Sequence, residues 1–416
     1  MKNLPFLDDD VARDWGEDLI ETSLQLLAMP STGLLRKEGG GVIAFRNLDV
    51  RALAANPEVA NTPADVLWAQ SSSRVTDGSF EILPARDDRL GFNWILQNQI
   101  FTSLPPLHAP TRRIIMRQMM PNNVQRFKPF IDDLVKRLVN RLVDHEEIEF
   151  AEDFAEPLVA QFWASVIGLT SEETISVQSL MRKLSPQFLL KRSADSSQSI
   201  DQASKDYMEL VSGAVLRTLS SRVSETVNEM ASDFEKIEIK EKPENLGIML
   251  AANLTEGFHT AALAVSNSFY SLLKYDTFRT IQADRTLIKG AFFEGTRLTP
   301  PVMATQRYAV SDIEYQGVKI SQGTAITMLW AAANRDPATF DDAETYRLSR
   351  PEQGATTFGW GPHLCPGRNI TRLLAESALS GIVECEVKFS LADFDYTWVP
   401  FNHMRQLSSF PVKLAR

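Results

Sequence analysis

The chain has 416 residues, and 44% of them are hydrophobic, so it can bury a large core. Its 43 Lys and Arg residues against 53 Asp and Glu residues give a formal net charge of −10. This balance argues against nucleic acid or an anionic membrane as the general partner. Two cysteines do not make a disulfide framework and favour a reducing cytoplasm.

No linker, repeat or low-complexity tract divides the sequence, so we expect a single domain over residues 1–416 with no fused reductase. Residues 1–10 have no apolar core and are typical of neither a signal peptide nor a membrane anchor. No window approaches the roughly 20 apolar residues that a bilayer span requires. We therefore expect a soluble, cytoplasmic protein.

Most of the chain has the apolar periodicity of helices, and strand signals are few and short. In chain order, the predicted elements are a strand at 41–45, a long loop at 67–107, helices at about 122–144, 152–167, 202–233 and 244–275, a hairpin at 315–323 closed by Gly323, and strands at 324–328 and 386–390. The 244–275 helix is apolar on several faces, which places it in the interior. The pattern predicts a mostly helical domain with small sheets.

The run 358–367 contains one thiol, Cys365, in a stretch of turn residues that a helix-forming segment follows. A thiolate there would lie near a helix N-terminus, where backbone N–H groups and the helix dipole stabilise negative charge. The glycines let the backbone pass close to a flat ligand, and His363 can donate to a neighbouring anion. This arrangement suits haem iron bound through a cysteine sulfur. The alternative is a buried structural cysteine in a glycine-rich loop.

Phe358, Gly361, Cys365 and Gly367 match the pattern F-x-x-G-x-x-x-C-x-G, so the run resembles the haem-binding loop of the cytochrome P450 superfamily. The resemblance implies a bacterial-type, soluble haem-thiolate monooxygenase with Cys365 as the ligand to the iron of haem b. The haem would lie between the long interior helix and the cysteine loop. Members of the family insert one oxygen atom from dioxygen into small to medium apolar organic substrates.

Glu294 and Arg297 are three residues apart, so a helix would place them on one face. For an isolated pair, a surface ion pair is the usual explanation. Here the segment 333–337, with the sequence Ala-Asn-Arg-Asp-Pro, follows, and then the cysteine loop. This order resembles the structural ion network of the family, with Arg350 as its third member. Its implied role is to hold the haem loop.

His108 and Arg112 lie four residues apart, and on a helix both would point the same way. The stretch resembles the family motif H-x-x-x-R, which binds haem propionates. Arg307 and His363 match two further propionate-binding positions. Buried carboxylates need charged donors, which Arg and His supply. The alternative for the first pair is a helix start with incidental polar residues.

The interior helix contains Gly257 and Thr260, which match the family pattern A/G-G-x-D/E-T, but His259 stands where an acid is usual. Glu256 stands where a small residue is usual, one helical turn before Thr260. Our hypothesis is that Thr260, with His259 or Glu256, forms the proton relay to iron-bound dioxygen. Glu256 also resembles the acid of the fatty-acid ω-hydroxylase branch, which can become esterified to haem. The alternatives are a hydrogen-bonded core histidine and a salt-bridged carboxylate.

Two further groups of residues have expected roles, the first by resemblance and the second because its members flank the haem motifs. The first group would line the substrate pocket and comprises Val302, Met303, Ala304, His403 and Met404. The second would form a basic docking face and comprises Arg113, Arg117, Arg368 and Arg372. That face would receive electrons from separate ferredoxin and ferredoxin reductase chains. A scatter of solvated arginines is the alternative for the second group.

Two rival functions remain open at this point. The unusual 256–260 stretch leaves room for a peroxide-driven enzyme, or for a haem-thiolate enzyme such as a dehydratase or isomerase that adds no oxygen. The second rival is a non-enzymatic haem sensor or carrier, although no signalling domain is attached.

Overall fold

The computed structural model describes residues 18–29, 33–37, 41–67, 91–385 and 387–415. The chain divides into two compact units. The sheet unit comprises residues 1–62, 266–365 and 389–410, and the helical unit comprises 63–265, 366–388 and 411–416. The expected fold class, mostly helical with small sheets, is confirmed. The prediction for residues 1–10 lies outside the described residues.

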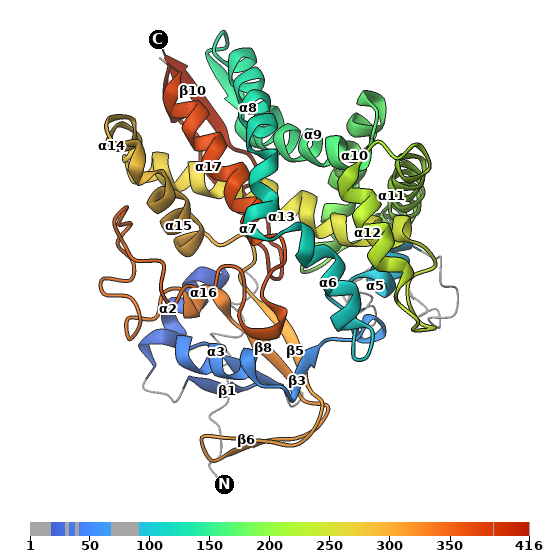
Figure 1. The fold of residues 1–416 in the computed structure, drawn as a ribbon. Helices are drawn as coiled ribbons and strands as arrows, with labels where there is room; N and C mark the ends of the chain where they lie inside the picture. Colours follow the sequence, from blue (N-terminus) through green and yellow to red (C-terminus); the bar gives the residue numbers. More distant parts are fainter. Residues whose placement is uncertain (1–17, 30–32, 38–40, 68–90, 386, 416) are drawn as a thin grey trace. The chain divides into compact units, whose positions relative to one another are not determined.

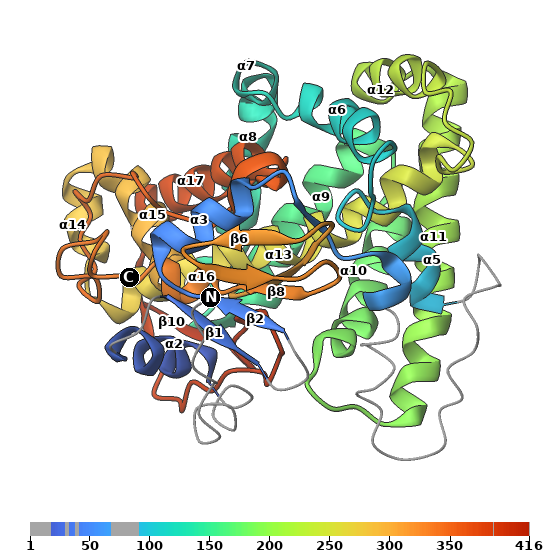
Figure 2. The ribbon, with the colours of Figure 1, turned by 90° about the horizontal axis from the view of Figure 1, so that it is seen from below.

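The sheet unit contains a five-stranded sheet in the order β1-β2-β8-β5-β3 (Figures 1 and 2). The strands of this unit are β1 (Leu34–Arg36), β2 (Val42–Ala44), β3 (Val59–Asn61), β5 (Thr305–Ala309), β6 (Ile313–Tyr315), β7 (Val318–Ile320) and β8 (Ala325–Met328). Its helices are α2 (Leu19–Ala28), α3 (Asn47–Ala55), α14 (Phe278–Ala283), α15 (Ile288–Leu298) and α16 (Trp330–Ala333). Strand β9 spans Lys388–Leu391. Its first residue belongs to the helical unit and the rest of the strand to the sheet unit.

The sheet joins segments that are far apart in the sequence. β2 pairs with β8 in parallel, with Ile43 opposite Thr327, while β5 pairs antiparallel with both β8 and β3. A buried apolar cluster under the sheet includes Val50 and Leu53 of α3 and Trp330 of α16. Because these helices pack on the same cluster as the strands, α3 and α16 are fixed beside the sheet (Figure 1).

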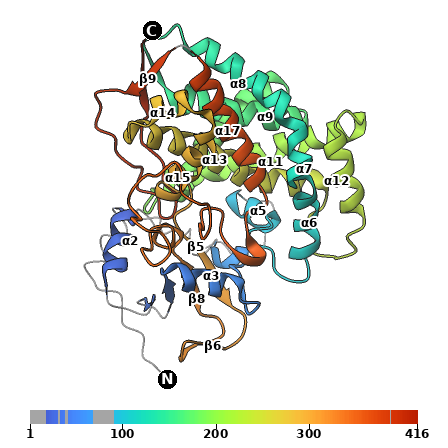
Figure 3. The ribbon, with the colours of Figure 1, turned by 60° about the vertical axis from the view of Figure 1, so that its left-hand side comes forward.

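The helical unit is built from longer helices (Figure 3). They are α5 (Gly91–Asn98), α6 (His108–Gln118), α7 (Pro121–Val124), α8 (Lys128–Leu142), α9 (Glu156–Ile167), α10 (Ser171–Leu184), α11 (Ala194–Ser221), α12 (Glu225–Glu235) and α17 (Arg368–Glu384), with the strands β4 (Glu147–Glu149) and β10 (Pro411–Ala415). β4 and β10 pair antiparallel. Helix α13 (Leu246–Lys274) contributes its residues up to 265 to this unit and the rest to the sheet unit.

The predicted interior helix at 244–275 is confirmed as α13. By length and composition this helix could cross a membrane, which the composition analysis did not anticipate. However, 72% of its most apolar window is buried inside the protein, as in the core helix of a globular fold. Packing inside the protein therefore accounts for the apolar composition of α13.

The predicted helix at 202–233 is two helices, α11 and α12. Arg222 ends α11 in the left-handed conformation, with φ 55°. Ser224 then begins α12, because its hydroxyl oxygen accepts a hydrogen bond from the Val227 N–H. Apolar periodicity continues across this break, so the pattern alone predicted one helix.

Two other local predictions need correction. The hairpin of β6 and β7 turns at Gln316 and Gly317, both with positive φ, rather than at Gly323. Two successive residues with positive φ are typical of a tight hairpin turn. In the predicted 67–107 loop, residues 91–98 form helix α5, and residues 68–90 lie outside the described residues. The strands at 41–45 and 324–328 are confirmed as β2 and β8.

Candidate functional site

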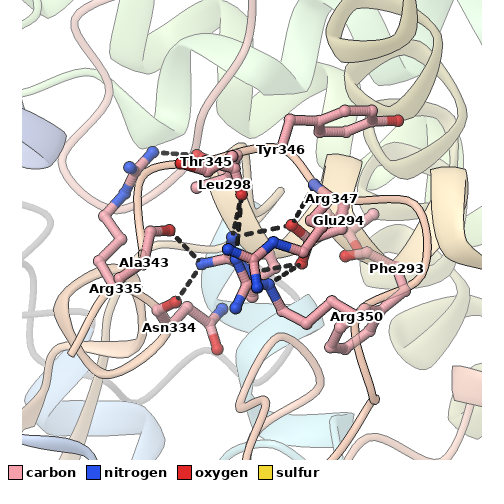
Figure 4. A network of polar contacts seen from close by, with 12 residues as sticks. Phe293, Glu294, Leu298, Asn334, Arg335, Ala343, Thr345, Tyr346, Arg347 and Arg350 are labelled. Atoms are coloured by element: carbon pink, nitrogen blue, oxygen red, sulfur yellow. Dashed lines mark hydrogen bonds and ion pairs between the residues drawn. The ribbon is translucent and has the colours of Figure 1, made fainter. Parts of the chain in front are cut away.

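The centre of the sheet unit is an ion network that contains no exposed charge (Figure 4). Glu294 on α15 accepts from Arg297 through both oxygens, at 2.6 Å from Nε and 2.9 Å from Nη2. Arg350 Nε lies 3.1 Å from Glu294 Oε1. The Glu294 and Arg297 side chains are fully buried. The structure thus brings together the three residues that the sequence grouped.

Arg297 also connects α15 to two distant segments. Its Nη1 donates to the backbone oxygens of Asn334 and Ala343, at 2.9 and 2.6 Å. The Asn334 side chain in turn accepts from the Thr356 N–H at 2.7 Å and donates to the Thr357 hydroxyl at 3.1 Å. The buried network therefore reaches the segment that leads into the cysteine loop.

The cysteine loop is a tight backbone turn. The Cys365 N–H donates to the Phe358 oxygen at 2.8 Å, and the Leu364 N–H donates to the Gly361 oxygen at 3.0 Å. Gly359 and Gly361 have φ of 76° and 71°, which side chains larger than hydrogen disfavour. Cys365 is partly buried, and α17 begins three residues later at Arg368.

The loop and its surroundings fit a haem group. A cysteine on a turn shaped by glycines can serve as a metal ligand through its sulfur. Arg307 on β5, also in the sheet unit, is only 6% exposed, and a buried guanidinium suits a carboxylate such as a haem propionate. His363 lies within the loop itself.

His108 and Arg112 belong to the helical unit. His108 is the first residue of α6 and Arg112 is one turn later, so both lie on one side of that helix. Both side chains are partly exposed. The four predicted propionate-binding residues are thus divided evenly between the two units.

The three relay candidates on α13 have different environments. Glu256 is partly buried, and the loss of solvation raises the pKa of its carboxyl, while a hydrogen bond with Gln99 acts in the opposite direction. His259 is also partly buried; the loss of solvation lowers its pKa to about 4, and its ring stacks on Phe188. The Thr260 hydroxyl donates to the Glu256 backbone oxygen at 2.6 Å. Near pH 7, His259 is therefore neutral.

Gln99 was missed by the sequence analysis. It is 1% exposed, and its Nε2 donates to the Thr255 hydroxyl at 3.0 Å and to the Ala252 oxygen at 3.1 Å. The next residue, Ile100, donates its N–H to the Asn253 side chain at 2.9 Å. These bonds attach the segment after α5 to α13 beside Glu256. No periodic or motif signal marks that segment.

The predicted pocket residues lie on two paired segments of the sheet unit. The Met303 N–H donates to the His403 oxygen at 2.7 Å, and Val302 pairs with Met404 in an isolated bridge. Met303 and Ala304 are buried in an apolar core cluster. Core packing accounts for those two side chains, and the assignment of all five residues to a pocket stays a prediction.

Comparisons with known proteins agree with this arrangement. The family model described as Cytochrome P450 matches residues 280–391, which include Glu294 and Cys365. The biotin biosynthesis cytochrome P450 of Bacillus subtilis (strain 168) is 26% identical over 76% of this chain and 80% of its own length. The cytochrome P450 monooxygenase PikC of Streptomyces venezuelae is 24% identical over 98% and 93%.

Solved structures show the same fold. The structure of P450BioI in complex with a fatty-acid-ligated acyl carrier protein has a TM-score of 0.80 at 19% identity, and the match covers 98% of this chain and 100% of that one. The tirandamycin C-bound P450 monooxygenase TamI has a TM-score of 0.79 at 22% identity, over 99% and 100%.

This chain belongs to the cytochrome P450 superfamily and is of the bacterial type. It is a haem-thiolate monooxygenase whose cofactor is haem b, and it acts on a small to medium organic substrate with dioxygen and electrons from separate redox partners. Several relatives are named monooxygenases or hydroxylases.

The ion network predicts an asymmetric cost of mutation. Glu294→Gln leaves two buried guanidinium groups without a counter-charge, so we expect it to lower the free energy of unfolding by about 3–5 kcal/mol. The control is Glu173→Gln, which removes a solvent-exposed pair with Arg217 and should cost no more than about 1 kcal/mol. Urea unfolding followed by circular dichroism measures both. Equal costs would show that the network does not stabilise the fold.

Proposed function

We propose that Cys365 is the residue that binds the haem iron through its sulfur. The observation that carries this proposal is the tight turn in which Cys365 lies, closed by the hydrogen bond from the Cys365 N–H to the Phe358 oxygen. Haem held by a thiolate supplies the oxidising power, because the sulfur pushes electron density to the iron and favours O–O cleavage. Glu294, Arg297 and Arg350 hold the segment that leads to this loop.

The haem propionates are assigned to His108, Arg112, Arg307 and His363. Charged donors in partly or fully buried positions offset the cost of removing carboxylates from water. We propose that residues 1–416 form one haem domain. Solved P450 structures that this chain matches over 98–100% of both lengths support that proposal. We place the protein in the cytoplasm.

The proton relay is assigned to Glu256 with Thr260. A relay group must hold a proton at working pH and release it, so its pKa should lie near that pH. Burial raises the pKa of Glu256 toward this range, whereas it lowers the pKa of His259 to about 4. His259 therefore carries no spare proton near pH 7, and its role is to pack on Phe188.

The electron donor is proposed to be a small acidic ferredoxin with its reductase, docking on basic residues of α6 and α17. Arg117 pairs with Asp233 at 2.8 Å and Arg372 pairs with Glu376 at 2.6 Å, so a neighbouring carboxylate offsets the positive charge of each arginine. The docking charge therefore rests mainly on Arg113, which is exposed, and on Arg368. The substrate is proposed to be a small to medium apolar molecule.

The first test is the visible difference spectrum of the dithionite-reduced protein with carbon monoxide. We expect the long-wavelength Soret band that thiolate ligation produces, and we expect its loss in Cys365→Ser. The matched control is Cys385→Ser, which removes the other cysteine, a free thiol outside the loop, and should keep the band. A band that survives in Cys365→Ser would refute the assignment.

The second test compares the two relay candidates. In Glu256→Gln the product formed per reduced cofactor consumed should fall by about tenfold or more, because the amide cannot pass on a proton. His259→Phe keeps an aromatic ring against Phe188 and should stay close to wild type. Uncoupling in His259→Phe but not in Glu256→Gln would reverse the assignment.

The third test concerns docking. Arg113→Glu should slow haem reduction by reduced ferredoxin about three- to tenfold at low ionic strength, and salt should remove the difference. Arg279→Glu on α14 is the control for an equal change of net charge at another exposed position. Identical rates for Arg113→Glu and the wild type in low salt would exclude this docking face.

A further inference from the structure

Helix α3 presents one face to residues 333–361, the segment that leads to Cys365. Asn47, Arg51, Ala54 and Ala55 are spaced by four, seven and eight residues, so they lie along one side of the helix. Asn47, Arg51 and the pair Ala54 and Ala55 contact different parts of that segment. All of these residues belong to the sheet unit.

Asn47, at the start of α3, fixes the beginning of the segment. Its Nδ2 donates to the Ala333 oxygen at 2.9 Å and to the Gly354 oxygen at 2.8 Å, and its N–H donates to Asp336 Oδ2 at 2.8 Å. Asn47 is fully buried. Because three bonds converge on one buried side chain and its N–H, this end of the contact is rigid.

Arg51, one turn later, lies on the indole of Trp360. Its guanidinium carbon is 3.9 Å from the ring centroid. Within the described part of the chain, its buried Nε has no hydrogen-bond partner, which matches a guanidinium lying over an aromatic face. A planar, weakly hydrated guanidinium suits this stacking better than an ammonium.

The end of α3 lies directly against Gly361. A Cβ at that position would be 2.4 Å from the Ala54 oxygen and 2.9 Å from the Ala55 Cα. The backbone of the loop therefore touches the backbone of the helix with no side chain between them. Gly361 and Trp360 are neighbours, so both anchor the tip of the loop to α3.

The contact with Arg51 anchors the side chain of Trp360 at a part of the turn where the neighbouring residues are glycines. Trp360 stands between Gly359 and Gly361, whose backbones have the widest conformational freedom. The same turn ends at the hydrogen bond between the Cys365 N–H and the Phe358 oxygen. A displaced Trp360 would therefore move the backbone that positions the sulfur. The Glu294 network reaches the segment separately, through Asn334 and Thr356.

We propose that Arg51 is a positioning residue for Cys365, which it acts on by holding Trp360 against α3. The proposal rests on the assignment of Cys365 as the ligand to the haem iron. Arg51 does not touch that ligand; it restricts the loop to the conformation that places the sulfur for binding. Loss of the contact should make the thiolate-bound state shorter-lived without releasing the haem.

The experiment follows the carbon monoxide band of the reduced holoprotein over time. In Arg51→Ala we expect the long-wavelength band to convert to the short-wavelength band about fivefold faster than in the wild type, as loss of one cation–π contact would produce. Total haem should not change. Arg51→Lys should be intermediate because it keeps the charge but not the planar group. Trp360→Phe should convert at a rate similar to that of Arg51→Lys, because the smaller ring weakens the contact.

The control is Leu48→Ala on the same helix, because that side chain is 69% exposed. The double variant Arg51→Ala with Trp360→Phe should convert no faster than Arg51→Ala alone. A wild-type rate in Arg51→Ala, or an equal acceleration in Leu48→Ala, would overturn the proposal. If Arg51→Ala fails to retain haem, the conversion rates of Arg51→Lys and Trp360→Phe are used instead. Wild-type rates in both variants would overturn the proposal. Absence of the long-wavelength band in the wild type would instead overturn the assignment of Cys365.

Discussion

The structure of the sheet unit depends on one buried carboxylate, Glu294, which is the counter-charge for both Arg297 and Arg350. A single unpaired charge at this depth would be costly, so the three residues keep one another in place. Arg297 uses its remaining donors on backbone oxygens of segments that follow it by 37 and 46 residues. In this way an electrostatic requirement inside α15 sets the path of the chain toward Cys365.

The cysteine loop is supported from two sides by different kinds of interaction. Hydrogen bonds reach it from the ion network through the side chain of Asn334. Packing reaches it from α3, through the stacked pair Arg51 and Trp360 and the close approach of Gly361. The hydrogen bonds restrict the direction of the segment, and the stacked pair restricts its distance from α3. Together the two supports restrict the backbone at the thiol more than either could alone.

The sequence predicted those parts of the site in which neighbours in space are also neighbours in the chain. Glu294 and Arg297 share one helical turn, and the turn at 358–365 is closed by its own backbone, so their spacing alone was informative. Gln99 and Arg51 were not predicted, because their partners lie about 150 and 310 residues away and no local pattern records such pairing. The same limit merged α11 and α12, since one left-handed residue does not alter apolar periodicity.

The parallel pairing of β2 with β8 has a consequence for synthesis. Ala44 lies opposite Met328, about 280 residues later in the chain. At roughly 5–20 residues per second, a ribosome would take on the order of 15–55 s to deliver the second strand. During that interval the open edge of β2 has no partner, so the nascent chain depends on its short pairing with β1, or on a chaperone, to avoid pairing with other chains.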